Sequence, residues 1–400
     1  MSYPAAPADR SPHGKRILLV SYYPPTRRHA GGLRLLDLYS LIRRLEPSLQ
    51  VDLVTCTDSM ADQIMQHDRG IFDRVFLLPV KNFTTRGLAA AGVLDTDYDI
   101  ADFQYWQSGR LIAGFRRRQR ARVIFSPMES NAKALLNDIR LAHTGIAVRP
   151  LIEHAAVGLL ELLYASKADT VQCVSHPDAA TIARCLPRTP VATVETGLSA
   201  IEFPRLARDG PVQRQPGTAR ELVFVAYFGS ANNVDALSWF LREVHPELCR
   251  RVPGYRFVVI GRGSAALDLK PDAHLEVRGE VESIEEHLLR AAAAIAPAFS
   301  GAGFRGKIVQ YAAAALPCVA SPLAADGLAF VDRESILIAG DARSFIDDCC
   351  ALLGSDDLNT RLGAAARQVC LGRYLWENKI PTVARLYQLN TASTPAGEAA

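Results

Sequence analysis

The strongest constraint on the fold is a rhythm in which short aliphatic runs alternate with longer helical stretches almost to the C-terminus. This rhythm is typical of βαβ units, in which helices cover both faces of parallel sheets. The fold class predicted is therefore α/β. The chain has 400 residues, well above the roughly 150 residues of one common domain, and we expect two domains.

Predicted strands fall into two series. The first series is 16–21, 51–55, 74–78, 100–103, 123–125 and 171–175, and the second is 221–227, 257–260, 274–277, 293–296, 318–320 and 336–338. Helices are predicted over 234–251 and 307–315, and the stretch 358–389 has a helical pattern. Both series predict a doubly wound, Rossmann-like sheet.

The rhythm stops between Thr196 and Arg220, where glycine and proline accumulate, as expected for an exposed connection between domains. The predicted units are a disordered tail (1–14), a first domain (15–196), a linker (197–220), a second domain (221–373), a helical segment that crosses back to the first domain (374–390) and a disordered tail (391–400). Two such domains face a cleft at the carboxyl ends of their strands, where folds of this class bind ligands.

Composition excludes several classes of protein. With 49% apolar and 22% charged residues the chain is globular, and its net charge of +3 gives no reason to expect nucleic acid as a partner. The eight cysteines form no Cys-x-x-Cys motif, so neither a disulfide framework nor a zinc site is expected. The start of the chain has no apolar signal segment and no run is long enough to span a membrane, which favours a cytoplasmic location.

One strand-to-helix junction of the second domain has the composition of an anion site. Gly301 and Gly303 follow a buried strand, and Arg305 and Lys307 open the next helix. Flexible backbone, a positive helix end and two cations favour a diphosphate, although a solvated helix start would look similar. Arg262, between two glycines after another strand, is a second candidate contact to a phosphate or a base; a plain turn is the alternative.

In the first domain, Gly31 and Gly32 lie between the first strand and a helix, where their backbone can approach an anion or a sugar, or simply form a turn. The spacing lacks the dinucleotide-binding fingerprint, so a nicotinamide cofactor is not expected. Asp95, Asp97 and Asp99 precede a strand instead of following one, so we interpret them as a solvated loop and expect no metal.

Arginines are concentrated at one helix-to-strand corner of the first domain. They are Arg116, Arg117, Arg118, Arg120 and Arg122. Three interpretations of this cluster stay open: a solvated face, a contact with a phosphorylated acceptor, and a peripheral contact with anionic lipids on the inner face of a membrane.

Taken together, these segments resemble GT-B fold glycosyltransferases of family 4, also called glycosyl transferases group 1. The most specific stretch is GAGFRGKIVQYAAAALPCVASPLAADGL (301–328), and YFGSANNVDALSWFLREVHPEL (227–248) is similar to the opening of that family's donor domain. In the first domain, AGGLR (30–34), the Glu129–Ser130 pair and VQCVSHPDAATIAR (171–184) are similar to the matching family segments.

This resemblance implies retaining transfer of a sugar from a nucleotide diphosphate sugar, without a metal or other cofactor, in polysaccharide, glycolipid or secondary-metabolite assembly. It implies that Arg305 and Lys307 bind the diphosphate and stabilise the leaving group. Candidate donor-binding residues are Gly229, Ser230, Arg262, Gly303, Phe304 and Gln310. Candidate residues of the acceptor or phosphate loop are Gly31, Gly32, Arg34 and Glu129.

The chain departs from the family pattern at several of these positions. The two glutamates that many members carry are replaced by Ala302 and Gln310, the usual threonine by Phe304, and the leucine after the arginine by Gly306. The histidine expected after the fourth strand is missing from the segment 102–106. Two alternatives therefore stay open: a catalytically degenerate protein that binds a nucleotide sugar or a partner, and a nucleotide-sugar epimerase of the same fold.

Overall fold

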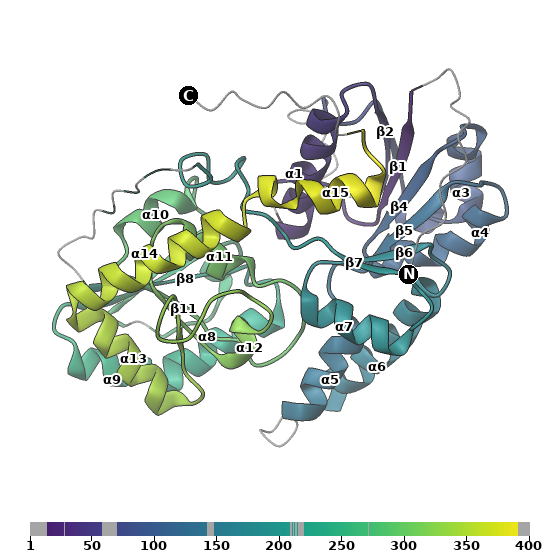
Figure 1. Cartoon of the computed structure of the whole chain (residues 1–400). Coiled ribbons are helices and arrows are strands. Elements are labelled where there is room, and N and C mark those ends of the chain that lie inside the picture. The colour runs from purple at the N-terminus through teal and green to yellow at the C-terminus, as the bar shows by residue number, and fades with distance from the viewer. Residues whose placement is uncertain are drawn as a thin grey trace.

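A computed structural model describes residues 14–390, apart from residues 28, 58–69, 142–147, 209, 211, 213, 215–219 and 271. Two α/β lobes lie side by side, and the chain returns to the first lobe at its end (Figure 1). Their parallel sheets have the strand orders β3-β2-β1-β4-β5-β6-β7 and β10-β9-β8-β11-β12-β13. The order reverses between β1 and β4 and between β8 and β11, and at such points doubly wound sheets open a crevice at the strands' carboxyl ends.

The first domain is built as follows. Its strands are β1 (Arg16–Ser21), β2 (Gln50–Cys56), β3 (Arg74–Leu78), β4 (Ile100–Gln104), β5 (Arg122–Ser126), β6 (Thr170–Cys173) and β7 (Val191–Thr193). Its helices are α1 (Ala30–Leu45), α3 (Thr85–Ala90), α4 (Ile112–Arg116), α5 (Asn131–Leu141), α6 (Val148–Ala165) and α7 (His176–Cys185). Short 3-10 turns are η1 (Val80–Asn82), η2 (Val93–Asp95) and η3 (Trp106–Leu111).

The second domain follows the same plan. Its strands are β8 (Arg220–Val225), β9 (Tyr255–Ile260), β10 (Leu275–Gly279), β11 (Ala293–Ala296), β12 (Cys318–Ala320) and β13 (Leu337–Ile338). Its helices are α8 (Ala231–Glu243), α9 (His245–Arg251), α10 (Ile284–Arg290), α11 (Gly306–Ala313), α12 (Pro322–Ala325), α13 (Ala342–Gly354) and α14 (Asp356–Arg373), with the 3-10 turn η5 (Ser264–Ala266). The turn η6 (Trp376–Lys379) and helix α15 (Ile380–Tyr387) end the described chain.

The single helix predicted over 234–251 is wrong, because the structure divides it into α8 and α9 at Val244. Pro246 lies in the first turn of α9, where the missing N–H is tolerated. Inside a continuous helix, the same proline would clash with the carbonyl one turn earlier. The long helical stretch 358–389 is divided in a similar way, since Pro381 lies in the first turn of α15.

The connection between the domains is less exposed than predicted. Leu198, Phe203 and Leu206 are buried in the core of the second domain, beside residues of β8, α11 and α14. Glycine and proline mark the irregular backbone of this segment, but the apolar residues between them pack on the second domain.

Helix α15 packs on α1 and β7 of the first domain (Figure 1). Val383, Leu386 and Tyr387 are buried in the core cluster formed by β1, α1 and β2. The Tyr387 hydroxyl donates a hydrogen bond of 2.6 Å to Asp102 Oδ2 at the heart of the first sheet. Helix α15 is therefore part of the first domain's core.

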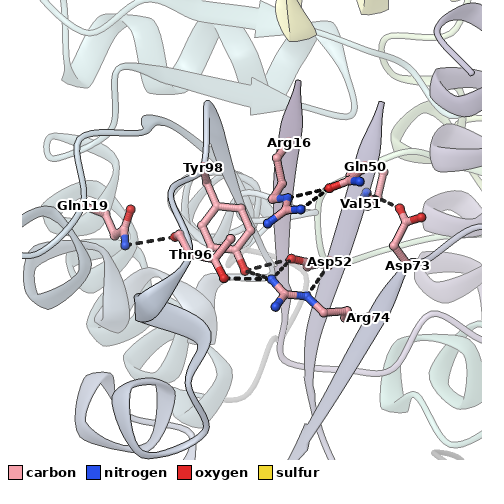
Figure 2. A network of polar contacts seen from close by, with 9 residues as sticks. All are labelled: Arg16, Gln50, Val51, Asp52, Asp73, Arg74, Thr96, Tyr98 and Gln119. Atoms are coloured by element: carbon pink, nitrogen blue, oxygen red, sulfur yellow. Dashed lines mark hydrogen bonds and ion pairs between the residues drawn. The ribbon is translucent and has the colours of Figure 1, made fainter. Parts of the chain in front are cut away.

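A polar network lies at the amino ends of β1, β2 and β3 in the first sheet (Figure 2). The buried carboxylate of Asp52 on β2 accepts hydrogen bonds from Arg74 on β3 and from the Tyr98 hydroxyl, at 2.5 and 3.0 Å. Because Asp52 is buried, these partners offset the cost of removing its charge from water. The network holds the register of β2 and β3 at the edge of the sheet.

Candidate functional site

A cleft of about 800 Å³ lies between the two domains, at the carboxyl ends of their strands. Its walls come from the start of α1 and the connection after β7 on one side, and from the segments after β8, β9 and β11 on the other. Volumes of this size suit ligands as large as a nucleotide sugar.

Lys307, in the first turn of α11, lines this cleft. Its Nζ donates a hydrogen bond of 3.1 Å to Asn233 Oδ1 and lies 4.4 Å from the centroid of the Phe224 ring. Burial and the neighbouring positive charge of Arg305 lower the pKa of Lys307 to about 7, while the Cys318 thiol acts in the opposite direction. A bound anion would restore the protonated form.

Arg305 braces its own loop at the edge of the same cleft. Its Nη1 and Nη2 donate hydrogen bonds to the carbonyls of Ala302 and Ser300, at 2.7 and 3.2 Å. Its buried Nε has no hydrogen-bond partner among the described residues. Burial lowers the pKa of Arg305 from its usual value, and the charges of Glu129 and Asp178 oppose that shift. The guanidinium thus holds the 300–305 loop and has one N–H that its described neighbours leave unsatisfied.

The N-terminus of α8 forms the floor beside Lys307. Ser230, Asn232 and Asn233 line the cleft, and the Ser230 side chain makes no capping hydrogen bond to the helix. Asn232 Oδ1 accepts a hydrogen bond of 2.8 Å from Ser300, so this turn is tied to the Arg305 loop. Backbone N–H groups of a first turn next to a lysine make an anion site.

The other predicted donor-binding residues lie around this floor. Phe304, Gln310 and Arg262 line the cleft, and the Arg262 guanidinium lies 4.9 Å above the Tyr227 ring. Gly229 lies behind the wall, where a Cβ would meet the Tyr227 hydroxyl at 2.2 Å.

The loop at Gly301 and Gly303 is held by the first domain. Asn137 Nδ2 donates a hydrogen bond of 2.8 Å to the Gly301 carbonyl, and a Cβ at Gly303 would lie 2.9 Å from the Glu129 Cβ. Both glycines have positive φ, 83° and 85°, which a side chain would strain. Nearby, Lys133 and Asp326 form an ion pair at 3.3 Å across the interface. This loop is therefore part of the contact between the two domains.

On the first-domain side, Arg34 and Glu129 line the cleft, but Gly31 and Gly32 do not belong to its described wall. Both glycines lie inside the first turn of α1, and not before it as predicted. A Cβ at Gly31 would meet the Tyr105 hydroxyl at 2.4 Å, and one at Gly32 the backbone of Thr26 at 2.6 Å. The start of α1 packs so closely on these neighbours that only glycine fits at both positions.

Arg34 is buried, and its Nε and Nη1 have no hydrogen-bond partner in the described part of the chain. Burial lowers the pKa of Arg34 to about 10. One turn further, burial raises the pKa of Asp37 to about 7, and Asp37 lines the cleft as well. Asp37 could not be recognised from the sequence, because helical periodicity alone does not reveal which polar position faces the other domain.

Tyr105 occupies the carboxyl end of β4, near where the family pattern expects a histidine. Its φ of 68° is rare for a residue with a side chain. The buried hydroxyl has no partner among the described residues and lies beneath Gly31. Asn232 and Asn233 were also missed as individual site residues, although polar residues at the start of the helix that follows a strand are a usual signal.

The arginine cluster is divided by the fold. Arg122 points inward and donates hydrogen bonds to the Leu386 carbonyl and to Thr170, at 2.5 and 2.9 Å. Arg116 pairs with Asp169 at 2.7 Å. Arg117, Arg118 and Arg120 are exposed. None of the helices in the described ranges is long and apolar enough to cross a membrane.

A family model described as glycosyl transferases group 1 matches residues 219–355. No curated protein matches the sequence of the chain. Among solved structures, sucrose-phosphate synthase from Thermosynechococcus elongatus is similar, with a TM-score of 0.68 and 14% identity over 94% of this chain and 98% of that chain.

HepE from Anabaena in complex with UDP-glucose is similar to the same degree, with a TM-score of 0.68 and 12% identity over 93% of this chain and 99% of that chain. A variant of S. aureus TarM in complex with fondaparinux, α-GlcNAc-glycerol and UDP has a TM-score of 0.62 and 9% identity over 93% and 99% of the two chains. At these identities the similarity concerns the fold. The predicted α/β class, with two Rossmann-like domains in the GT-B arrangement, is confirmed.

Proposed function

We propose that this glycosyltransferase moves a sugar from a nucleotide diphosphate sugar to an acceptor bound by the first domain. Its residues 219–355 match the glycosyl transferases group 1 model. The observation that carries the proposal is Lys307 beside the N-terminus of α8, inside the cleft and bonded to Asn233. The donor diphosphate lies between this lysine and the first turn of α8. Arg305 Nε supplies a further donor to it.

The proposed transfer retains the anomeric configuration and needs no metal. As the sugar leaves, negative charge grows on the diphosphate, and fixed cations and helix N–H groups stabilise it without rearranging. Lys307 is one such cation. Retention is tested by the NMR coupling of the anomeric proton in the first product formed, and metal independence by turnover in excess EDTA. Inversion of the anomeric configuration would refute retention. Turnover that EDTA abolishes and only a divalent cation restores would refute metal independence.

A panel of nucleotides and nucleotide sugars tests the proposal directly. The HepE and TarM structures contain UDP or UDP-glucose, so UDP and UDP-sugars are the first probes. A ligand of the native state raises the melting temperature as its concentration increases. Acceptor-dependent release of the nucleotide supports a transferase. Binding without release supports the degenerate alternative that Phe304 and Gln310 motivate, and a new nucleotide sugar formed without an acceptor supports an epimerase.

The affinity for UDP should fall as the pH rises above about 7. The pKa of Lys307 is about 7 in the free protein, and the diphosphate binds the protonated lysine. Above that pKa each pH unit lowers the association constant by up to about tenfold. The free energy of unfolding changes in the opposite sense. In the unfolded chain Lys307 has its ordinary pKa, so between about pH 7 and 10 it holds more protons than in the folded protein. The free energy of unfolding therefore rises with pH over this range.

Isothermal titration calorimetry with UDP from pH 6.5 to 9 measures this dependence. Asp37 and Glu202 also line the cleft, and burial raises the pKa of each to about 7. The Lys307→Ala variant separates their contribution, because it should lose most of the pH dependence. An unchanged slope in that variant would assign the effect to the two carboxyl groups.

We also propose that the first domain rests on the cytoplasmic face of an anionic membrane. Arg117, Arg118 and Arg120 are exposed in the segment after α4. Arg116 Nε donates a hydrogen bond of 2.7 Å to the Lys167 carbonyl just beyond α6, which brings this segment close to the C-terminal end of α6. On α6 itself, Ile152, Leu159 and Leu163 repeat at helical spacing and remain 63%, 71% and 49% exposed. An apolar stripe that ends in basic residues suits the interface of an anionic bilayer.

Charge reversal at Arg117, Arg118 and Arg120 should weaken binding to phosphatidylglycerol vesicles by at least about 100-fold, because each cation near the surface contributes about 1 kcal/mol and the new acidic groups are repelled as well. Cosedimentation at increasing salt measures the effect, and wild-type binding should weaken as salt screens the charges. The matched control reverses three exposed arginines of the second domain, Arg220, Arg343 and Arg361. Equal losses in both triple variants, or no wild-type binding at low salt, would reject the membrane contact.

A further inference from the structure

Three potential metal ligands meet at the amino ends of β9 and β10, outside the cleft. His245 and Cys249 lie one turn apart on α9, and Asp272 comes from the connection between β9 and β10. His245 is buried, Cys249 is partly buried and Asp272 reaches the surface. The ligand atoms of all three lie within 4.8 Å of one another.

Two of the distances between these atoms fit a shared metal ion. His245 Nε2 lies 3.3 Å from Asp272 Oδ2 and 3.6 Å from Cys249 Sγ. An N–H···O hydrogen bond is usually about 2.7–3.2 Å long. A tetrahedral zinc ion with bonds of about 2.0–2.3 Å separates its ligand atoms by about 3.3–3.6 Å. Moreover, Nε2 makes a single hydrogen bond, as donor or acceptor according to the tautomer, whereas the Asp272 carboxylate and the Cys249 sulfur both converge on it.

Neighbouring groups hold two of the ligands in orientation. His245 Nδ1 lies 3.0 Å from the Tyr255 hydroxyl, which can accept the ring N–H and leave the Nε2 lone pair free for a metal. The backbone N–H of His274 donates to Asp272 Oδ1 at 2.7 Å, so Oδ2 is the oxygen turned toward the histidine. His274 is itself fixed, because its Nδ1 lies 2.9 Å from the Tyr255 carbonyl. Outer-shell partners of this kind are typical of metal-binding histidines.

We propose that His245, Cys249 and Asp272 bind a zinc ion, with water in the fourth position. Thiolate, imidazole and carboxylate together are a zinc ligand set, and the exposed side of Asp272 leaves room for the water. The cysteine thiol loses its proton to solvent when its sulfur binds the metal. The sequence does not predict this site, because it contains no Cys-x-x-Cys motif there. The ligands are instead an i, i+4 pair on a helix and a distant residue of a loop.

This zinc site is separate from the proposed sugar transfer. Strand β9 runs from Tyr255 beside the ligands to Ile260 at the cleft, a length of about 17 Å at 3.3 Å per residue. The ion would join α9 to the β9–β10 connection and so stabilise the second domain. Turnover should not require it.

Cobalt substitution tests the site in the full-length protein. After treatment with a chelator and a reductant, one equivalent of Co²⁺ should produce tetrahedral visible bands and thiolate-to-cobalt charge transfer in the near ultraviolet, and Zn²⁺ should displace both. Cys249→Ser should abolish the charge transfer. Asp272→Asn should weaken Zn²⁺ binding at least about tenfold, since outer-shell partners alone contribute 10–100-fold.

The control variant is Cys185→Ser, which removes an exposed thiol of the first domain and should leave the cobalt spectrum unchanged. Asp272 is at the surface, so its variant tests the site even if a change at buried His245 prevents folding. Zn²⁺ should raise the melting temperature of the wild-type protein but not of Cys249→Ser. The proposal is overturned if no thiolate charge transfer forms, if it persists in Cys249→Ser, or if it is lost in Cys185→Ser.

Discussion

Replacing Lys307 with alanine should lower kcat/KM for the nucleotide sugar by about 10²–10³-fold. The change removes the cation that lines the cleft beside the first turn of α8, and one fixed donor at developing negative charge contributes about 3–4 kcal/mol to a transition state. The loss should appear in kcat as well as in KM, because the charge on the diphosphate is greatest as the sugar leaves. Steady-state kinetics with the donor identified by the ligand panel measure it.

Two further variants make the result specific. Lys307→Arg keeps a positive charge and should recover part of the lost activity, although its larger planar head fits less well beside Phe224. Lys81→Ala removes an exposed lysine of the first domain and should behave like the wild type. If Lys307→Ala turned over the donor at the wild-type rate, the diphosphate would have to bind elsewhere.

The Gly303→Ala variant should lose about tenfold or more in kcat/KM, because a methyl group there prevents the domains from closing. At φ 85° a side chain costs about 1–3 kcal/mol. In addition, the new Cβ would lie 2.9 Å from the Glu129 Cβ of the other domain, so the first domain must move away. Kinetics with the same donor, together with the radius of gyration from small-angle scattering, measure both effects.

Gly254→Ala is the matched control for backbone strain. Gly254 has a φ of 75°, but a Cβ added there would meet nothing within 4 Å, and the residue is not part of the cleft wall. Both variants should unfold at lower temperature, while only Gly303→Ala should lose activity and remain more open. Equal activity in the two variants would show that the Glu129 contact does not limit closure.

Much of the fold could be predicted from the sequence because buried parallel strands are short, continuous aliphatic runs. The predicted bounds of β1, β3, β11 and β12 agree with the structure. Strand β7 was missed because it has three residues at the edge of its sheet, all partly buried. The break between α8 and α9 was missed although Pro246 marks it, since the apolar pattern continues across the proline.

The two walls of the candidate site also differ in how far the sequence could predict them. The second-domain wall could be predicted because Arg305, Lys307 and Ser230 lie at the starts of the helices that follow β11 and β8, and their place in the cleft follows from local sequence. The first-domain wall depends on how the two domains meet. Contacts such as Asn137 with Gly301 join residues 164 positions apart, and no periodicity in one domain reveals them.

The return of the chain to the first domain also determines how the cleft can open. The Leu198 N–H donates to the Tyr374 carbonyl at 2.6 Å, and Leu198 pairs with Leu375 as a parallel bridge. The two crossings between the domains therefore lie side by side, and we expect them to act as a two-stranded hinge. Such a hinge would permit bending about one axis but resist twisting, so the two walls of the cleft should separate and meet again in register. With Tyr387 bonded to Asp102, the far end of that hinge is anchored inside the first domain.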